Sequence, residues 1–168
     1  LNLEKVGAHQ QVLTGANTYF GTTHISGGTL TVDGSIAGSG VTVASGGRLN
    51  GGVVGTPGVV SSPIVVQSGG RYSAGSNTFN VNTGNGVGQM NVTAGGVAMQ
   101  WDAGAEFTFE FNAMPTGGAV AGTNWDYVNV VGGTLKINAS LANTINVFVD
   151  AWNTANTAYG PNNLSSTA

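Results

Sequence analysis

A Gly-Gly step, flanked on both sides by short runs of alternating apolar and polar residues, occurs five times in this 168-residue chain. The ten glycines are Gly27, Gly28, Gly46, Gly47, Gly69, Gly70, Gly95, Gly96, Gly132 and Gly133. Self-similarity of this kind is the signature of a repeat architecture, in which each unit buries its apolar face by stacking on its neighbours. The distance between successive copies increases along the chain, which indicates insertions between the later units.

The residues around these glycines predict short strands. Val41-Thr42-Val43 and Met90-Asn91-Val92 precede two of the steps, and Leu30-Thr31-Val32 and Leu135-Lys136-Ile137 follow two others. Apolar residues at every second position are typical of half-buried strands. Because glycine can adopt positive φ without a Cβ clash, a Gly-Gly step suits a tight corner between two such strands. Two or three strands every 20 to 25 residues, roughly, correspond to one coil of a β-solenoid.

The composition supports a folded all-β chain. Only 7% of the residues are charged, 29 are glycine and 40% are hydrophobic, and the hydrophobic residues alternate too regularly for a disordered chain. No stretch shows the helical spacing of an apolar face, so we expect almost no α-helix. We therefore predict one β-solenoid domain of irregular coils over residues 1–150, followed by a C-terminal tail over residues 151–168.

Charge and cysteine content exclude several functions. The formal net charge is −3 and there are four lysines and arginines in total, too few for the clustered basic face that nucleic-acid binding requires. The chain has no cysteine, hence no disulfide framework, thiolate metal site or cysteine nucleophile. It also has no apolar run long enough to cross a membrane as a helix. Few lysines and many Gly, Ser, Thr and Asn residues indicate an exported bacterial protein.

Two segments resemble a known family. Residues 5–7 (KVG) and residues 13–30 (LTGANTYFGTTHISGGTL) resemble the passenger-associated transport repeat, also called the autotransporter-associated β-strand repeat. Residues 125–130 (WDYVNV), followed by another Gly-Gly step, look like a segment found near the end of such repeat regions. The resemblance, taken over residues 1–150, implies a right-handed parallel β-helix at the bacterial cell surface. It implies no catalytic residues.

Three acidic residues form the densest cluster of charge in the sequence. Asp102, Glu106 and Glu110 are the candidate ligands for a metal, and Ca²⁺ is the cofactor that carboxylates with nearby amide oxygens would suit. Glu106 and Glu110 alternate with phenylalanines, so they are expected to share the solvated outer face of one strand. Their separation along an extended strand, about 13 Å, exceeds that of a glycosidase carboxylate pair. A solvated outer face is therefore the main interpretation, with calcium binding as the alternative.

The fourth Gly-Gly copy departs from the others. Ala98 stands where the earlier copies have Leu30, Leu49 and Tyr72, whereas Val97 and Met99 carry the apolar alternation. A one-residue slip exchanges the two faces of a strand. We therefore predict a β-bulge or the start of a new strand at this point.

The ends of the solenoid are candidate interaction sites. A solenoid exposes unpaired strand edges at both ends unless they are capped, and neither end of this sequence encodes an amphipathic capping helix. We therefore expect self-association, either between copies or between adjacent repeats of a longer chain. In the tail, Trp152 and Tyr159 could contact a partner, although a frayed terminus is the simpler interpretation.

The sequence therefore predicts a structural or adhesive module of an exported surface protein that stacks end to end into a stalk or fibre, and no enzyme. Two alternatives stay open. A glycan-binding module would show a row of exposed aromatic side chains, and a polysaccharide lyase or hydrolase would show acids and bases clustered on one face. Surface glycans are accordingly a second class of partner.

Overall fold

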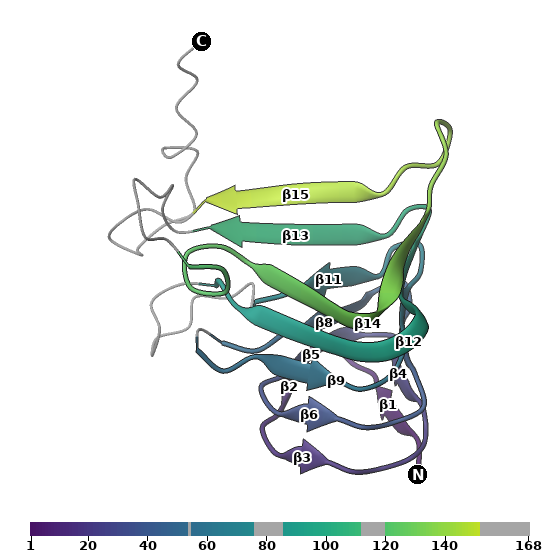
Figure 1. The fold of residues 1–168 in the computed structure, drawn as a ribbon. Coiled ribbons are helices and arrows are strands. Elements are labelled where there is room, and N and C mark those ends of the chain that lie inside the picture. The colour runs from purple at the N-terminus through teal and green to yellow at the C-terminus, as the bar shows by residue number, and fades with distance from the viewer. Residues whose placement is uncertain (54, 76–85, 112–119, 152–168) are drawn as a thin grey trace.

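The computed structural model describes residues 1–53, 55–75, 86–111 and 120–151, and the described residues form fifteen β-strands and no helix. The strands wind into six stacked coils of a parallel β-solenoid, with the N-terminus at the bottom of Figure 1. The strands are β1 (Leu3–Lys5), β2 (Gln10–Leu13), β3 (Ala16–Asn17), β4 (Thr23–Ile25), β5 (Gly28–Val32), β6 (Ser35–Ile36), β7 (Val41–Val43), β8 (Gly47–Asn50), β9 (Gly58–Val60), β10 (Ile64–Val66), β11 (Arg71–Ser73), β12 (Gln89–Asp102), β13 (Glu106–Phe111), β14 (Tyr127–Asn138) and β15 (Asn146–Ala151). The prediction of an all-β parallel solenoid is confirmed.

Each coil contributes to three faces. The first face consists of β1, β4, β7, β10 and the second halves of β12 and β14. The second face is β2, β5, β8, β11, β13 and β15, and the third is β3, β6, β9 and the first halves of β12 and β14. Every named strand pair is parallel, so equivalent residues of successive coils lie directly above one another.

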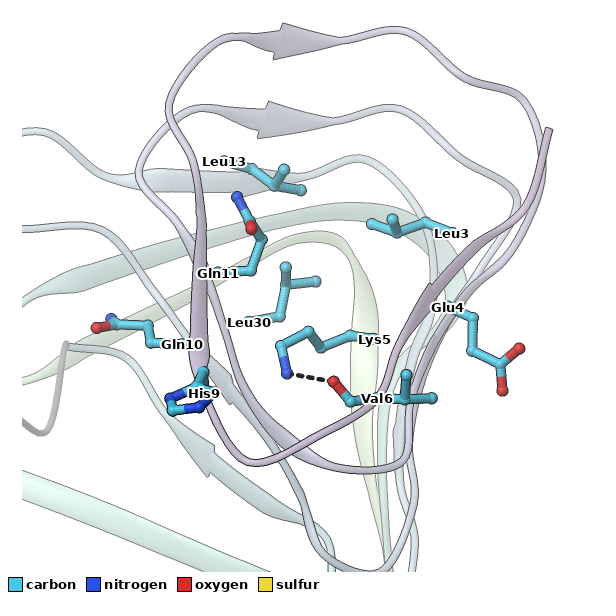
Figure 2. Close-up of a pocket in the computed structure, with 9 residues that line it drawn as sticks. All are labelled: Leu3, Glu4, Lys5, Val6, His9, Gln10, Gln11, Leu13 and Leu30. Atoms are coloured by element: carbon cyan, nitrogen blue, oxygen red, sulfur yellow. Dashed lines mark hydrogen bonds between the residues drawn. The ribbon is translucent and has the colours of Figure 1, made fainter.

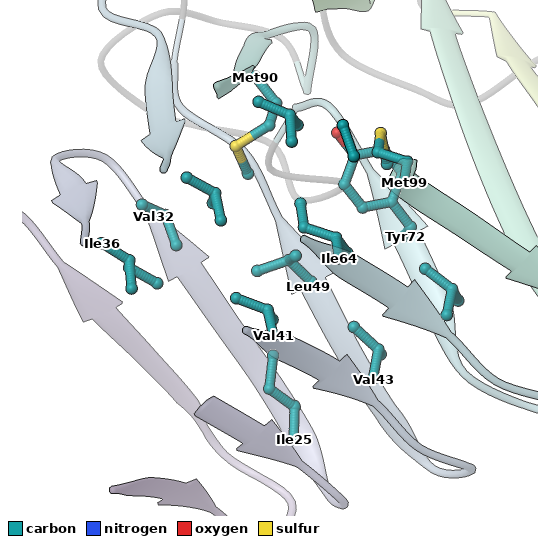
Figure 3. Close-up of a cluster of buried hydrophobic side chains, with 14 of the residues drawn as sticks. Ile25, Val32, Ile36, Val41, Val43, Leu49, Ile64, Tyr72, Met90 and Met99 are labelled. Atoms are coloured by element: carbon teal, nitrogen blue, oxygen red, sulfur yellow. The ribbon is translucent and has the colours of Figure 1, made fainter. Parts of the chain in front are cut away.

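The core is built from columns of inward-facing side chains. Leu30, Leu49 and Tyr72 pair in register on the second face, and all three are fully buried. Short strands on the first face show the same alternation: in β7, for example, Val41 and Val43 are buried and Thr42 between them is half-buried. Figure 3 shows Val41, Val43, Leu49 and Tyr72 among the side chains that meet between the faces. The period of two in the sequence thus determines which residues form the core.

The Gly-Gly steps lie at two different corners, which corrects the single repeat frame expected from the sequence. The first three steps, at Gly27, Gly46 and Gly69, separate the first face from the second. The last two lie inside β12 and β14, where each strand turns from the third face to the first, and Gly96 pairs with Gly133. At the first corner of the fifth coil, the equivalent glycine is instead Gly104, whose carbonyl accepts a hydrogen bond from Gly69 N at 2.8 Å.

The predicted irregularity after the fourth Gly-Gly step is present. Along the β12–β14 pair, the register shifts between Thr93 and Gly96 and again between Val97 and Met99. β12 nevertheless continues through the corner, because its residues 90–92 pair with β9 and its residues 99–101 pair with β10. The bulge therefore belongs to the bend that joins two faces within one strand.

Candidate functional site

The lowest coil contains a buried lysine from the KVG segment. Lys5 is 9% exposed and occupies the column that Ile25 and Val43 occupy in the coils above. Its ammonium donates to the carbonyl oxygens of Val6 (2.9 Å), Gly7 (3.0 Å) and Gly27 (2.9 Å). These three bonds use all the donors of a lysine, so the charge is satisfied by backbone at the corner. Figure 2 shows the side chain crossing the open lower end of the core.

The same corner explains why Gly28 is required. Its φ is +63°, and a Cβ at this position would lie 2.3 Å from the carbonyl oxygen of Gly7 and 2.6 Å from that of His9. Both the backbone conformation and the close approach of the lower coil exclude a side chain. Lys5 and Gly28 therefore hold the first two coils together at one point, and both come from segments that carry the family resemblance.

A second polar cluster lies where the fourth coil meets the fifth. Ser73 at the end of β11, Glu110 in β13 and Asp126 just before β14 are all buried. Ser73 Oγ lies 3.3 Å from both Glu110 Oε2 and Asp126 Oδ2, and Asp126 accepts the backbone N–H groups of Gly88 (2.9 Å) and Glu110 (3.2 Å). Asp126 thus connects three segments of chain.

Burial determines the protonation of this cluster. Desolvation raises the pKa of Asp126 well above its ordinary value, and the nearby negative charge of Glu110 raises it further, against the lowering effect of the two backbone hydrogen bonds and of Ser73. A serine hydroxyl has one proton, so Ser73 can donate to only one of the two carboxyl groups at a time. The contact between the Ser73 hydroxyl and the other carboxyl group is favourable when that carboxyl group is itself protonated and donates to the hydroxyl oxygen.

The structure separates the three predicted acidic residues. Asp102 accepts hydrogen bonds from Gln100 (2.8 Å) and Asn138 (2.9 Å), whereas Glu106 forms an ion pair with Arg71 (2.7 Å). The expectation that Glu110 lies on a solvated outer face is wrong, because its exposed fraction is 0%. Within the described residues, no three His, Asp or Glu side chains are grouped as a metal site would require.

The burial of Glu110 has a structural cause. The chain returns along the end of β13, where Trp125 forms an antiparallel bridge with Phe111 and Asp126 N donates to the Glu110 carbonyl at 2.8 Å. Glu110 therefore lies beneath a segment that follows it in the sequence. Trp152 and Tyr159, the predicted partner contacts, lie outside the described residues.

A shallow recess of about 270 Å³ lies on the second face. It crosses four successive strands, and its lining combines both signs of charge with one aromatic ring. The lining residues are Arg48, Arg71, Glu106, Thr108, Phe148 and Asp150. Arg48, Arg71 and Glu106 stack in register, which places a charged column along one wall.

The described aromatic residues mostly serve the core. Trp101 stacks on Phe107 with ring centroids 4.9 Å apart, and Phe107 stacks on Tyr72 at 5.9 Å. Trp101 is 9% exposed and Tyr72 is fully buried, so this group stabilises the upper coils from within. It supplies no exposed row of rings of the kind expected for a glycan platform.

The top coil is open. Its inward-facing residues Leu135, Ile137, Val147 and Val149 are 43–54% exposed, whereas Met99 and Trp101, directly below the first two, are 1% and 9% exposed. Among the described residues, β15 pairs only with β13, and the second half of β14 pairs only with β12. An apolar core surface and two strand edges are therefore exposed at this end.

Comparisons with known proteins connect the lower coils to one family. A family model of the passenger-associated-transport-repeat matches residues 3–32. This range covers β1 to β5 and contains Lys5 and Gly28, but it does not reach the WDYVNV segment. No curated protein and no solved structure matches the chain. No helix of the described residues could span a bilayer.

Proposed function

We propose that this chain is a non-catalytic structural module of an exported bacterial surface protein, where its stacked coils form part of a stalk or fibre. The observation that carries the proposal is that Lys5 and Gly28, two residues within the passenger-repeat match, both contact backbone where neighbouring coils meet. Lys5 gives all three of its N–H donors to backbone carbonyls at a corner, and Gly28 accommodates the carbonyls of the coil beneath. The matched residues therefore hold coils together.

Stacked parallel coils suit this role physically. Each coil contacts the next through in-register pairs, so the length of such a module grows with the number of coils while its cross-section stays the same. Together with the passenger-repeat match, this geometry supports an extracellular location, because passenger regions are the exported parts of their proteins. Asp102 and Glu106 also take part in contacts between strands of neighbouring coils, with Asn138 and Arg71 respectively.

Two measurements test the proposal. An antibody raised against the chain should label intact, unpermeabilised cells of the bacterium that encodes it, and a protease added outside should remove the signal. Labelling only after permeabilisation would refute the location. The purified chain should also release no product from a panel of polysaccharides, and a reproducible product that disappears in a Glu106→Gln variant would indicate a lyase or hydrolase instead.

Glycan binding is a second candidate, because the recess on the second face has suitable chemistry. Arginine and carboxylate side chains hydrogen-bond sugar hydroxyls, and Phe148, which is 48% exposed, offers an apolar ring at its edge. A glycan array probed with the chain tests this candidate. Binding that is lost in Phe148→Ala and kept in Val97→Ala, a change at an exposed residue outside the recess, would support it.

A further inference from the structure

We propose that the open top coil binds the bottom coil of a second copy of this chain, in the same parallel register that joins the coils within one molecule. We call the second half of β14 together with β15 the upper end, and β1 together with β2 the lower end. The inference rests on the proposed structural function and names the partner and the pairing.

The upper end requires a covering layer. Leu135, Ile137, Val147 and Val149 continue the buried core columns but are about half exposed, and the edges of β14 and β15 can accept another strand. Exposed parallel edges with few charges are templates for further strand pairing. An extended segment with apolar residues at alternate positions, added in parallel, would complete the columns.

The lower end matches this surface at its leucines, whereas the column that ends at Val147 begins with Gln11 in the lowest coil. Leu3, Leu13 and Leu30 line a recess of about 430 Å³ at the base of the core, which Figure 2 shows from the side of the lowest coil. Lys5 also faces it, but its ammonium already makes three hydrogen bonds to backbone carbonyls of the first two coils. Covering this end would therefore leave no lysine donor unsatisfied.

The register on the first face brings opposite charges together. Leu3-Glu4-Lys5 lies below Thr23-His24-Ile25, and the same columns end at Leu135-Lys136-Ile137 in the top coil. If a second copy continues these columns, its Glu4 lies over Lys136 and its Leu3 over Leu135. Both charged residues are exposed, and opposite charges directly across a strand pair stabilise it.

The second face gives an independent match. Continuing its columns places Val12 of the second copy over Phe148 and Leu13 over Val149. Val12 and Phe148 are outward-facing apolar residues that are 37% and 48% exposed. Contact of either side chain with water is unfavourable while the ends stay apart. Stacking would bury both. The contact joins two different surfaces at opposite ends of the solenoid axis, so successive copies extend along that axis into a linear filament.

The experiment measures the size of the purified 168-residue chain by sedimentation velocity over a wide range of concentration, and its shape by negative-stain electron microscopy. Wild type should grow with concentration into unbranched filaments with an axial repeat of about 29 Å, from six coils stacked at about 4.8 Å each. A monomer at every concentration would overturn the proposal. A dimer that grows no further would also overturn it, because that result means identical ends pair with each other.

Charge reversal tests the register. Glu4→Lys and Lys136→Glu should each weaken association about tenfold, equivalent to about 1.4 kcal/mol, because each places like charges across the contact. The double variant Glu4→Lys/Lys136→Glu should recover wild-type association, and so should an equimolar mixture of the two single variants, which can alternate along a filament. Failure of both recoveries would refute this register.

A core substitution gives a stronger effect with a matched control. Val149→Asp should abolish filaments, because it places a carboxylate against Leu13 of the next copy. Val97→Asp changes a valine of similar exposure on β12, whose strand is already covered by β14, and should leave association unchanged. Far-UV circular dichroism shows whether each variant folds. Surface labelling of cells does not depend on filament growth. A chain that forms no filaments can still label at the cell surface, and a chain that forms filaments can still fail to label, so the two proposals are tested separately.

Discussion

The buried cluster of Ser73, Glu110 and Asp126 predicts that part of the stability of this solenoid is lost as pH rises. Burial and the adjacent Glu110 raise the pKa of Asp126 well above 3.8 in the folded protein, whereas the unfolded chain keeps the ordinary value. Between these two pKa values, the folded state binds a proton that the unfolded state does not. The contribution of Asp126 to the free energy of unfolding is therefore largest at acidic pH and falls as pH rises through this interval.

The size of the effect follows from one proton. While the folded state holds one proton more than the unfolded state, the free energy of unfolding falls by about 1.4 kcal/mol for each unit of pH. The slope vanishes below the ordinary pKa, where both states are protonated, and above the raised pKa, where both are ionised. Burial also raises the pKa of Asp33, so the slope of the whole protein contains more than this cluster.

Urea unfolding at a series of pH values isolates the contribution of Asp126. Trp101, packed against Phe107 in the core, provides a fluorescence signal for the transition. The comparison is with Asp126→Asn, which keeps a side-chain oxygen for Gly88 N–H but cannot take up the proton. As pH rises through the affected interval, the free energy of unfolding of wild type minus that of the variant should fall by up to about 1.4 kcal/mol per pH unit.

A difference that is independent of pH, or a wild type that gains stability relative to the variant as pH rises, would contradict a raised pKa of Asp126. Either result would mean that Asp126 is ionised in the folded state across the range. Glu110→Gln provides a further control. Removing the neighbouring charge should lower the pKa of Asp126 in the folded protein, so the pH interval over which Asp126 changes the free energy of unfolding should become shorter.

Three other substitutions test the contacts that hold the coils together. Lys5→Met keeps the stem but removes three hydrogen bonds to carbonyls, and should lower the free energy of unfolding by about 2 kcal/mol or more, whereas Lys136→Met on the exposed surface should change it little. Gly28→Ala should cost more than about 2 kcal/mol because of positive φ and backbone overlap, whereas Gly15→Ala, where a Cβ meets nothing within 4 Å, should be nearly neutral. Trp101→Ala should cost about 3–5 kcal/mol by leaving a cavity beside the stacked rings. Urea denaturation measures all of these. Equal losses for Lys5→Met and Lys136→Met, or for Gly28→Ala and Gly15→Ala, would contradict these roles, and so would a loss below about 1 kcal/mol for Trp101→Ala.

The fold can be predicted well from the sequence because each coil is specified by short patterns of neighbouring residues. Alternation of apolar residues identifies Leu30, Leu49 and Tyr72 as one buried column, and the glycines identify corners. The sequence misplaces the later glycines because two corners of the coil use the same dipeptide. At Gly104, an Ala-Gly-Ala segment replaces the expected Gly-Gly step, so the repeat continues without its usual signal.

The buried polar residues could not be predicted in the same way. Alternation shows which side of β13 Glu110 occupies, but it gives no information about the segment around Asp126 that later covers that side. Lys5 has the charge of a surface residue, and only the position of three carbonyl oxygens explains its burial. The KVG segment is part of the resemblance to the passenger repeat, but nothing in that pattern indicates that its lysine is buried.

The arrangement of coils also determines how the molecule would respond to a pulling force along its axis. The strands lie across that axis, so the force would peel hydrogen-bonded pairs apart one after another instead of shearing a whole sheet at once. Peeling would begin at an end coil, because the strands at either end of the solenoid have a neighbour on one side only. The chain between Thr23 and its partner Val41 is about half as long as that between Met99 and its partner Leu135. Each upper coil that detaches would therefore release about twice as much chain length as a lower one. The solenoid would act as an extensible tether, with most of its extension coming from the C-terminal coils.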